Sequence, residues 1–353
     1  MHRRRFLQTA GLLSIAPGVP SISTGDPRPG SARPPIIKPR RLSPGDTVGI
    51  VSPASATFQS VDVQIAQESL EALGLKVKLG AHMMERHGYL AGDDKARAAD
   101  INRFFEDRSI AAVHPIRGGW GSTRLLPYLD FDRIRDNPKI IVGYSDITAL
   151  LLSIQAKTGL VTFHGPIALG RWDTWSVDYV KRVLFGTEPV TFEPKRDLNP
   201  DRNSLVQTEF RVQTITPGTA RGRLLGGNLT VLTTIVGSGY LPDWDGAILF
   251  TEDVHEEPYR IDRMLTQLKL SGALSKIKGF IFGGCSECTP GEGSYGGLTL
   301  EEIFDDHIKP LGIPAWQGAM IGHQQPQWTL PEGIQVEIDA TAGTIRELEL
   351  PVA

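Results

Sequence analysis

The chain has 353 residues, of which 40% are hydrophobic and 22% are charged, and its formal net charge is −3. These values are typical of soluble globular proteins, and the length is sufficient for two domains of ordinary size. The small negative charge argues against a nucleic-acid-binding protein, and the longest apolar stretch is too short to span a bilayer, so we expect no stable membrane anchor.

The first 38 residues have the pattern of an export signal followed by a linker. A basic cluster, Arg3–Arg5, precedes Phe6 and a short, weakly apolar stretch. Arg-Arg-x-Phe-Leu-Gln matches the twin-arginine consensus, although a disordered basic tail is an alternative. Residues 17–38 are rich in Pro, Gly and Ser, as cleavage regions and linkers often are. We therefore expect residues 1–38 to lie outside the fold and the mature protein to be periplasmic.

Short β-branched strands alternate with amphipathic helices over residues 39–185, which we assign to an N-terminal domain. The predicted strands are Thr47–Val51, Leu75–Leu79, Ile110–Ile116, Ile140–Val142 and Val161–Phe163. The predicted helices are Val61–Leu73, Asp93–Phe105, Thr123–Leu129 and Ile147–Gln155. Strands that alternate with helices through short connections predict a parallel, doubly wound α/β sheet.

The pattern weakens over residues 186–219, where several prolines mark a connecting region. Strands and helices then alternate again over residues 220–353. The predicted strands are Ala220–Leu225, Ala247–Thr251, Ile277–Phe282 and a hairpin of Ile334–Ile338 with Thr344–Leu350. The predicted helices are Leu229–Val236, Tyr259–Leu270 and Leu300–Ile308. This region is a second α/β domain with more strand content.

Ser145 lies in an abrupt turn from a strand to a helix. Only the four residues Gly143 to Asp146 separate the predicted strand Ile140–Val142 from the predicted helix Ile147–Gln155. Such a turn places a hydroxyl at the carboxyl edge of the sheet, above free N–H groups that suit an oxyanion, as in a nucleophile elbow. The alternative is that Ser145 only caps the helix, and the second glycine of G-x-S-x-G is missing.

A nucleophilic serine needs a base and a carboxylate that orients the base. His114, His164 and His323 are the candidate bases, and His323 stands in a loop after a strand, where catalytic groups often collect. A loop histidine is also often simply solvated. Glu252 ends the predicted strand Ala247–Thr251 beside Asp253, a place where carboxylates serve active sites or cap helices.

Two short motifs each have two readings. Gly118 and Gly119 follow a strand, so their backbone N–H groups are candidates to bind an oxyanion, although a tight turn also explains them. Cys285 and Cys288 have C-x-x-C spacing, but two ligands do not make a zinc site. They can pair in an oxidising compartment. We slightly favour two unpaired cysteines in a loop.

Taken together, the motifs resemble the LD-carboxypeptidase family of serine peptidases, which also contains the microcin-immunity proteins. The resemblance covers the chain from about Pro39 to the C-terminus, in the order of the family. The segments that carry it are Gly88–Asp93, Arg117–Gly121, Leu125–Asp130, Asn137–Asp146, Phe163–Pro166, Gly226–Leu229, Glu252–Asp253 with Pro258–Arg263, and Gly322–His323.

The resemblance implies a Ser–His–Glu triad without a metal or a cofactor. Ser145 falls on the nucleophile of the family, His323 on its base and Glu252 on its acid. The backbone amides of Asp146 and Gly119 fall on the oxyanion donors. For substrate contacts we expect three further residues: Gly118, Trp120 and Asn228.

The resemblance also implies a flavodoxin-like N-terminal domain with a parallel sheet and a swivelling β/α C-terminal domain, with the site between them. The expected substrate is a small muropeptide, from which the enzyme hydrolyses the L-to-D bond of murein tetrapeptides and releases D-alanine. Family members are often dimers, so we expect a homodimer. A microcin-immunity-like amidase that cleaves peptidyl-aminoacyl conjugates and a non-catalytic periplasmic binding protein are the alternatives.

Two features depart from the family pattern. The family usually has Tyr where Trp120 stands, which alters the rim of the substrate site. Most members that recycle murein act in the cytoplasm, whereas this chain has the sequence of an export signal. These two departures bear on which substrate the protein meets in the cell more than on the catalytic chemistry.

Overall fold

The computed structural model describes residues 33–195, 206–207, 210–289 and 297–353. Residues 1–32 of the predicted signal and linker lie outside the described residues, so the export signal stays a prediction. Residues 33–38 belong to the fold, contrary to the prediction, because Ile37 pairs with Leu160 in a parallel bridge. Residues Ala32–Ala353 form one compact unit. None of the described helices combines the length and the apolar character needed to cross a membrane.

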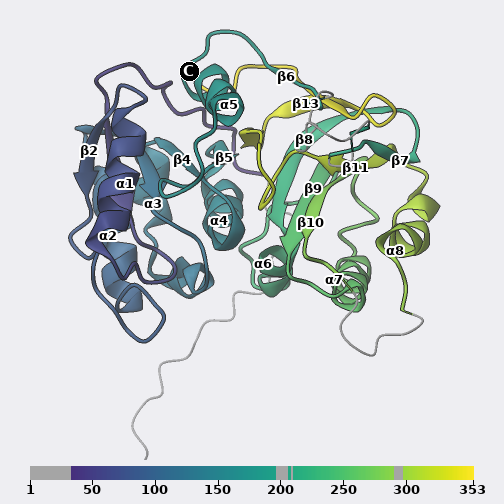
Figure 1. The fold of residues 1–353 in the computed structure, drawn as a ribbon, viewed down its shortest axis with the longest axis horizontal. Helices are drawn as coiled ribbons and strands as arrows, with labels where there is room; N and C mark the ends of the chain where they lie inside the picture. Colours follow the sequence, from purple (N-terminus) through teal and green to yellow (C-terminus); the bar gives the residue numbers. More distant parts are fainter. Residues whose placement is uncertain (1–32, 196–205, 208–209, 290–296) are drawn as a thin grey trace, which may run out of the picture. The chain divides into compact units, whose positions relative to one another are not determined.

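The N-terminal domain is built on a six-stranded sheet with the order β12-β5-β4-β3-β1-β2 (Figure 1). The strands β1 to β5 pair in parallel, and β12 pairs with β5 in the antiparallel direction. The strands are β1 (Thr47–Val51), β2 (Lys76–Leu79), β3 (Ile110–Pro115), β4 (Ile140–Gly143), β5 (Thr162–His164) and β12 (Leu330–Glu332). The α-helices are α1 (Ser60–Glu71), α2 (Asp94–Glu106), α3 (Phe131–Asp136), α4 (Thr148–Thr158) and α5 (Thr174–Leu184).

The C-terminal domain is built on an eight-stranded sheet with the order β6-β14-β13-β8-β9-β10-β11-β7 (Figure 1). The central strands β8, β9, β10 and β11 are parallel, and the outer ones are antiparallel. The strands are β6 (Thr191–Phe192), β7 (Gln213–Thr216), β8 (Thr219–Asn228), β9 (Ala247–Val254), β10 (Gly279–Ser286), β11 (Ala315–Ala319), β13 (Gln335–Asp339) and β14 (Thr344–Glu347). The helices are α6 (Leu229–Thr234), α7 (Pro258–Leu270) and α8 (Leu300–His307).

Helix α4 joins the two domains. The helix is buried on nearly every side, and Leu150, Leu151 and Leu152 are fully buried. The helix contacts β4 and β5 of its own domain as well as β8 and α6 of the other. Burial of each leucine stabilises the fold by roughly 2 kcal/mol. The start of α4, directly after Ser145, is therefore held in place by both domains.

The expected architecture of a parallel-sheet domain and a second β/α domain is confirmed, but several elements differ from the prediction. The predicted helix Thr123–Leu129 is a 3₁₀ helix over Ser122–Tyr128, which contains Pro127. Proline lacks the N–H that an α-helix requires. Helices α3 and α5 and the short strands β6, β7 and β12 were not predicted from the sequence, and β6 and β7 lie in the region that was predicted to be only a connection.

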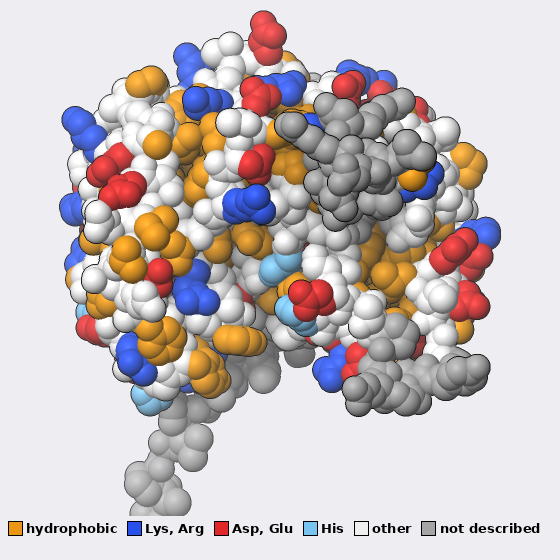
Figure 2. Space-filling view, viewed as in Figure 1, with side chains coloured by type: hydrophobic (Ala, Val, Ile, Leu, Met, Phe, Trp, Pro, Cys, Tyr) orange, Lys and Arg blue, Asp and Glu red, His pale blue; other side chains and the backbone are white. Residues whose placement is uncertain are grey.

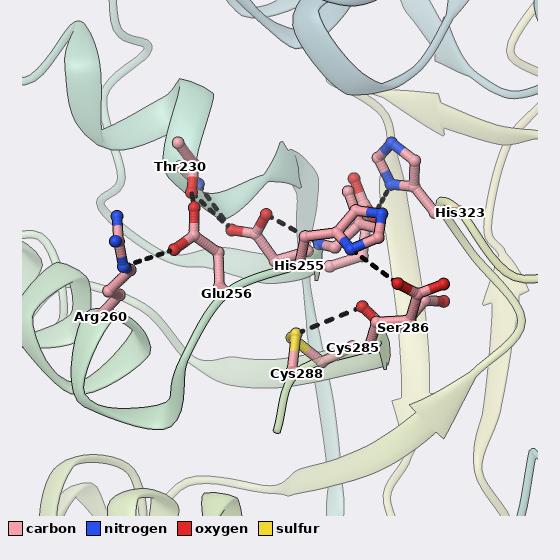
Figure 3. Close-up of a disulfide and its surroundings, with 12 residues drawn as sticks. Thr230, His255, Glu256, Arg260, Cys285, Ser286, Cys288 and His323 are labelled. Atoms are coloured by element: carbon pink, nitrogen blue, oxygen red, sulfur yellow. Dashed lines mark hydrogen bonds and ion pairs between the residues drawn. A yellow bond between two sulfur atoms is a disulfide. The ribbon is translucent and has the colours of Figure 1, made fainter. Parts of the chain in front are cut away.

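The two cysteines form a disulfide, so the preference for unpaired cysteines is wrong. Cys285 is the second-to-last residue of β10, and the chain then bends so that the amide of Cys288 donates to the carbonyl oxygen of Cys285 at 3.4 Å. This bend brings the two Cα atoms to 5.4 Å, within the range of a disulfide. Figure 3 shows the bridge beside the segment that carries His255.

Candidate active site

Ser145 lies at a strained turn between β4 and α4. Its φ is +62°, a left-handed conformation that L-residues rarely adopt. A Cβ on Gly143 would lie 2.8 Å from Ile147, so only glycine allows the strand to turn this tightly into the helix. The turn therefore has the form of a nucleophile elbow, and the Ser145 side chain makes no capping bond to the helix.

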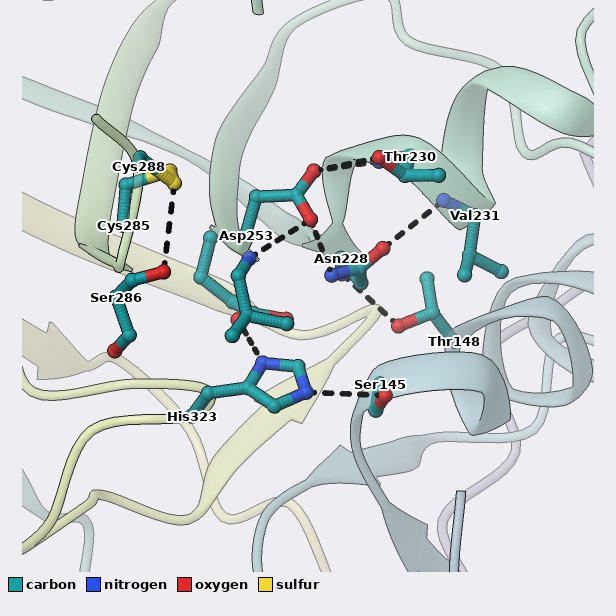
Figure 4. Close-up of polar contacts among 12 residues, drawn as sticks. Ser145, Thr148, Asn228, Thr230, Val231, Asp253, Cys285, Ser286, Cys288 and His323 are labelled. Atoms are coloured by element: carbon teal, nitrogen blue, oxygen red, sulfur yellow. Dashed lines mark hydrogen bonds and ion pairs between the residues drawn. A yellow bond between two sulfur atoms is a disulfide. The ribbon is translucent and has the colours of Figure 1, made fainter. Parts of the chain in front are cut away.

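Ser145, His323 and Glu252 form one hydrogen-bonded chain. Figure 4 shows the contact between Ser145 and His323. The Ser145 Oγ lies 3.1 Å from Nε2 of His323, and Nδ1 of His323 lies 2.8 Å from Oε2 of Glu252. When Nδ1–H donates to the carboxylate, Nε2 is left as the acceptor of the serine proton. The structure thus brings together the three residues that the sequence proposed for a triad.

Each domain contributes to this chain of contacts. Ser145 comes from the N-terminal domain, whereas Glu252 lies in β9 and His323 in the turn after β11. Gly322 has a φ of +79°, and a Cβ there would lie 2.1 Å from the Glu252 carboxylate. Glycine before His323 therefore allows the histidine turn to approach the buried acid.

Burial and charge act in opposite directions on the histidine and the glutamate. Burial lowers the pKa of His323, but the hydrogen bond and the charge of Glu252 outweigh burial and raise it. Burial raises the pKa of Glu252, yet its contacts with His323 outweigh burial and lower it. Glu252 is fully buried, so its charge is compensated mainly by the imidazole. The pair therefore favours a carboxylate and an easily protonated histidine.

The neighbouring carboxylate, Asp253, has a different role. It accepts hydrogen bonds from Nδ2 of Asn228 at 3.0 Å and from the amide and hydroxyl of Thr230, both at 2.9 Å. Burial and the nearby charge of Glu252 raise the pKa of Asp253 to about 6. Asp253 thus holds Asn228 and Thr230 in the wall of the cavity, whereas Glu252 is the acid that contacts His323.

The other two candidate histidines do not contact Ser145. His114 and His164 are both buried, and burial lowers the pKa of each to about 4. The ring of His164 packs edge-on against Tyr144, which in turn packs against His323 with ring centroids 5.1 Å apart. The two buried histidines are therefore neutral packing residues at neutral pH.

The Gly118–Gly119 turn lies over the nucleophile. A Cβ on Gly118 would stand 3.2 Å from Ser145 Oγ and 3.5 Å from the Asp146 amide, so the missing side chain leaves room above the hydroxyl. The Asp146 amide lies in the first turn of a helix, where N–H groups have no partner within the helix. The two predicted oxyanion donors, Asp146 and Gly119, thus lie in the segments that border Ser145.

Ser55 holds this turn from the other side, a role that the sequence analysis missed. Its hydroxyl accepts a hydrogen bond from the Trp120 amide at 3.1 Å, and its amide donates to the Gly118 carbonyl at 3.4 Å. Gly119 has a φ of +115°, and a Cβ there would lie 2.0 Å from Ser55 Oγ. The position of Ser55 just after β1, at the carboxyl edge of the sheet, was the available signal.

Ser145 opens into a cavity of about 860 Å³ between the two domains. Gly118, Trp120 and Asn228, the predicted substrate contacts, all line it. Trp120 is 66% exposed at the rim, where its ring meets that of Tyr89 edge-on. The Asn228 side chain is already engaged, since it donates to Asp253 and accepts from the Val231 amide. On the face in Figure 2, histidine and acidic side chains lie together near the centre.

Both halves of the chain match known domains of one family. Residues 48–165 match the LD-carboxypeptidase N-terminal domain, and residues 221–338 match the LD-carboxypeptidase C-terminal domain. The chain belongs to the LD-carboxypeptidase family. It is accordingly a member of a family of peptidases, which are hydrolases.

Relatives in this LD-carboxypeptidase family carry two kinds of name. The chain is 40% identical over 308 residues to the probable murein peptide carboxypeptidase of Bacillus subtilis, covering 87% of this chain and 93% of that one. It is 31% identical over 300 residues to the murein tetrapeptide carboxypeptidase of Pseudomonas aeruginosa, covering 81% and 91%. A solved structure of the microcin C7 self-immunity protein MccF superposes with a TM-score of 0.79 and 30% identity, covering 90% of this chain and 100% of that one.

Proposed function

We propose that this protein is a serine carboxypeptidase that hydrolyses the L-to-D peptide bond of murein tetrapeptides and releases the terminal D-alanine. The observation that carries the proposal is the hydrogen-bonded chain from Ser145 through His323 to Glu252. Relatives named murein peptide and murein tetrapeptide carboxypeptidases support the choice of substrate.

Acylation follows from the order of these contacts. Nε2 of His323 takes the hydroxyl proton while Ser145 Oγ attacks the scissile carbonyl carbon. The negative charge that develops on the carbonyl oxygen is stabilised by the amides of Asp146 and Gly119. The imidazolium then gives its proton to the leaving amine of D-alanine, and Glu252 stabilises the imidazolium until that transfer.

Deacylation uses the same groups, with water as the nucleophile and Ser145 Oγ as the leaving group. Water enters the place that D-alanine leaves, and His323 takes its proton as the oxygen attacks the acyl-enzyme carbonyl. The same two amides bind the second oxyanion. Ser145 is released when His323 returns the proton to Oγ. The residues described here supply every proton transfer of this cycle.

Two alternatives remain as competing proposals. The close structural match to a microcin C7 self-immunity protein favours an amidase that cleaves peptidyl-aminoacyl conjugates. A binding protein without turnover is the other. The strained φ of +62° at Ser145 argues against pure binding, because strain of this kind is typical of a nucleophile that must project into a site.

We expect the purified protein to release D-alanine from stem tetrapeptides that contain L-lysine or meso-diaminopimelate at the third position. A tetrapeptide that ends in L-alanine is the matched substrate, and aspartyl sulfamoyl adenosine tests the amidase. Released amino acids and nucleoside are measured by chromatography. Cleavage of the nucleoside conjugate alone would establish the amidase, and binding of tetrapeptide without release would establish the binding protein.

We also propose that the enzyme is exported by the twin-arginine route and meets its peptides in the periplasm. Changing Arg3 and Arg4 to Lys together is expected to keep the precursor in the cytoplasm, because this route requires the arginine pair. Arg5→Lys changes the variable position of the motif and is the matched control, which should still be exported. Cell fractionation and the N-terminal sequence of the product report the outcome. Full-length protein in the cytoplasm of unmutated cells contradicts the proposal.

A further inference from the structure

Arg117 lines the same cavity as Ser145, and no carboxylate of the described residues pairs with it. Arg117 lies two residues beyond the end of β3 and is half-buried. Within the described part of the chain, its guanidinium forms no ion pair. Its one hydrogen bond there runs from Nη1 to the carbonyl oxygen of Ala56 and is long at 3.4 Å. Nε is buried and has no partner in the described residues.

The other arginine of the cavity wall is already neutralised. Arg124 donates from Nε to both oxygens of Asp94, at 3.0 Å each, and from Nη2 to one of them at 2.9 Å. An arginine held in this way has little capacity left for a ligand. A half-buried guanidinium that no carboxylate of the described residues contacts favours an anion supplied by a ligand.

The surroundings of Arg117 place this anion on one side of the scissile bond. The amides of Ala168 and Leu169 donate to the carbonyl oxygens of Pro115 and Ile116, so the segment of Ile167 borders the arginine. The carboxylates of Asp253 and Glu256, which come from the C-terminal domain, also line the cavity and repel an anion. A carboxylate bound near Ser145 is therefore drawn towards the Arg117 wall.

The proposed substrate has a carboxylate at the required place. The carboxyl carbon of the terminal residue lies only two bonds of about 1.5 Å each from the scissile nitrogen. Guanidinium and carboxylate match in a bidentate geometry that fixes orientation as well as charge. A cation that recognises the terminal carboxylate also explains how a peptidase restricts cleavage to the last residue.

We propose that Arg117 is the receptor for the free α-carboxylate of the terminal D-residue and so determines exopeptidase specificity. This inference rests on the proposed function, because it presumes a peptide substrate whose last residue leaves. It assigns the wall of Arg117 and Ile167 to the leaving residue. The wall of Asp253 and Glu256 then faces the acyl part of the substrate.

The test measures binding, so that it does not depend on turnover. In the Ser145→Ala background, calorimetry compares stem tetrapeptide ending in D-alanine with the same peptide ending in D-alaninamide. The peptides differ only in the terminal charge. We expect the acid to bind roughly 10- to 100-fold more tightly than the amide, as a charge-assisted bidentate contact predicts.

Adding Arg117→Met is expected to reduce this preference to less than about threefold, mainly by weakening the binding of the peptide that ends in the free acid. Arg117→Lys should retain part of the preference. Arg124→Met is the matched control and should keep the full preference, since Arg124 is already paired with Asp94. A preference that survives Arg117→Met overturns the inference. An equal loss of affinity for the acid and the amide also overturns the inference, because it indicates that Arg117 only supports the Gly118–Gly119 turn. Binding of neither peptide overturns it as well.

Turnover by the unmutated enzyme separates this inference from the proposed function. If the tetrapeptide binds with an Arg117-dependent preference for the acid but no D-alanine is released, the proposed function fails and the carboxylate site stands. If D-alanine is released while acid and amide bind equally, the proposed function stands and the carboxylate site is refuted.

Discussion

Replacement of Ser145 by alanine is expected to reduce kcat by up to ~10⁶ while the fold persists. The reason is that Ser145 Oγ lies 3.1 Å from Nε2 of His323, and among the described residues no other hydroxyl forms a hydrogen bond with this imidazole. Initial rates of D-alanine release measure the loss. Thermal unfolding followed by circular dichroism checks the fold, and a serine-reactive phosphonate should label Ser145 only.

Ser153→Ala provides the matched control for this variant. Ser153 lies in α4, is fully buried, and its hydroxyl has no hydrogen-bond partner in the described residues. Ser153→Ala removes a hydroxyl oxygen, as Ser145→Ala does, but from the helix that follows Ser145. It should leave kcat nearly unchanged. Comparable turnover by the Ser145→Ala variant would falsify the serine mechanism.

Replacement of Glu252 by glutamine is expected to lower kcat by about 10⁴. A glutamine amide that donates towards Nδ1 of His323 favours the tautomer with a proton on Nε2, which cannot accept the proton of Ser145. The variant is nearly isosteric, so the effect reports charge and tautomer more than packing. Steady-state kinetics with the tetrapeptide measure the change.

The pH profile provides a second readout of the same variant. Glu252 raises the pKa of His323, and the histidine must be neutral to act as a base. Loss of the negative charge lowers that pKa, so the acid limb of kcat/KM should move to lower pH in Glu252→Gln. Glu256→Gln is the control, because Glu256 contacts Thr230 and Arg260 instead of His323. If Glu256→Gln shows the large loss instead, the acid has been assigned to the wrong residue.

The residue pattern alone predicted much of the fold that positions the site. Strands such as β4, with four buried residues, and helices such as α4 have long or strongly apolar patterns that local sequence reveals. The strand β12 has only three residues, one of them Pro331, and it forms because β5 offers an edge far away in the sequence. Pairing of this kind has no local signal.

The residues of the site also differ in how far the sequence alone predicts them. Ser145 was found from its turn, and Glu252 was preferred to the adjacent Asp253 because it ends the predicted strand, a choice with which the resemblance agrees. The structure separates them by their contacts, since one meets His323 and the other meets Asn228 and Thr230. The disulfide depends on a bend after β10 that two cysteines alone do not reveal.

The pairing of β12 with β5 bears on how the protein is made. Leu330–Glu332 emerges from the ribosome only near the end of synthesis, so until then the outer edge of β5 remains open for pairing with other chains. The first sheet is therefore completed only after the strands of the second sheet that precede residue 330 have been made. This order requires that the whole chain be present in one compartment to finish folding, which suits the proposed twin-arginine route because that route carries folded proteins.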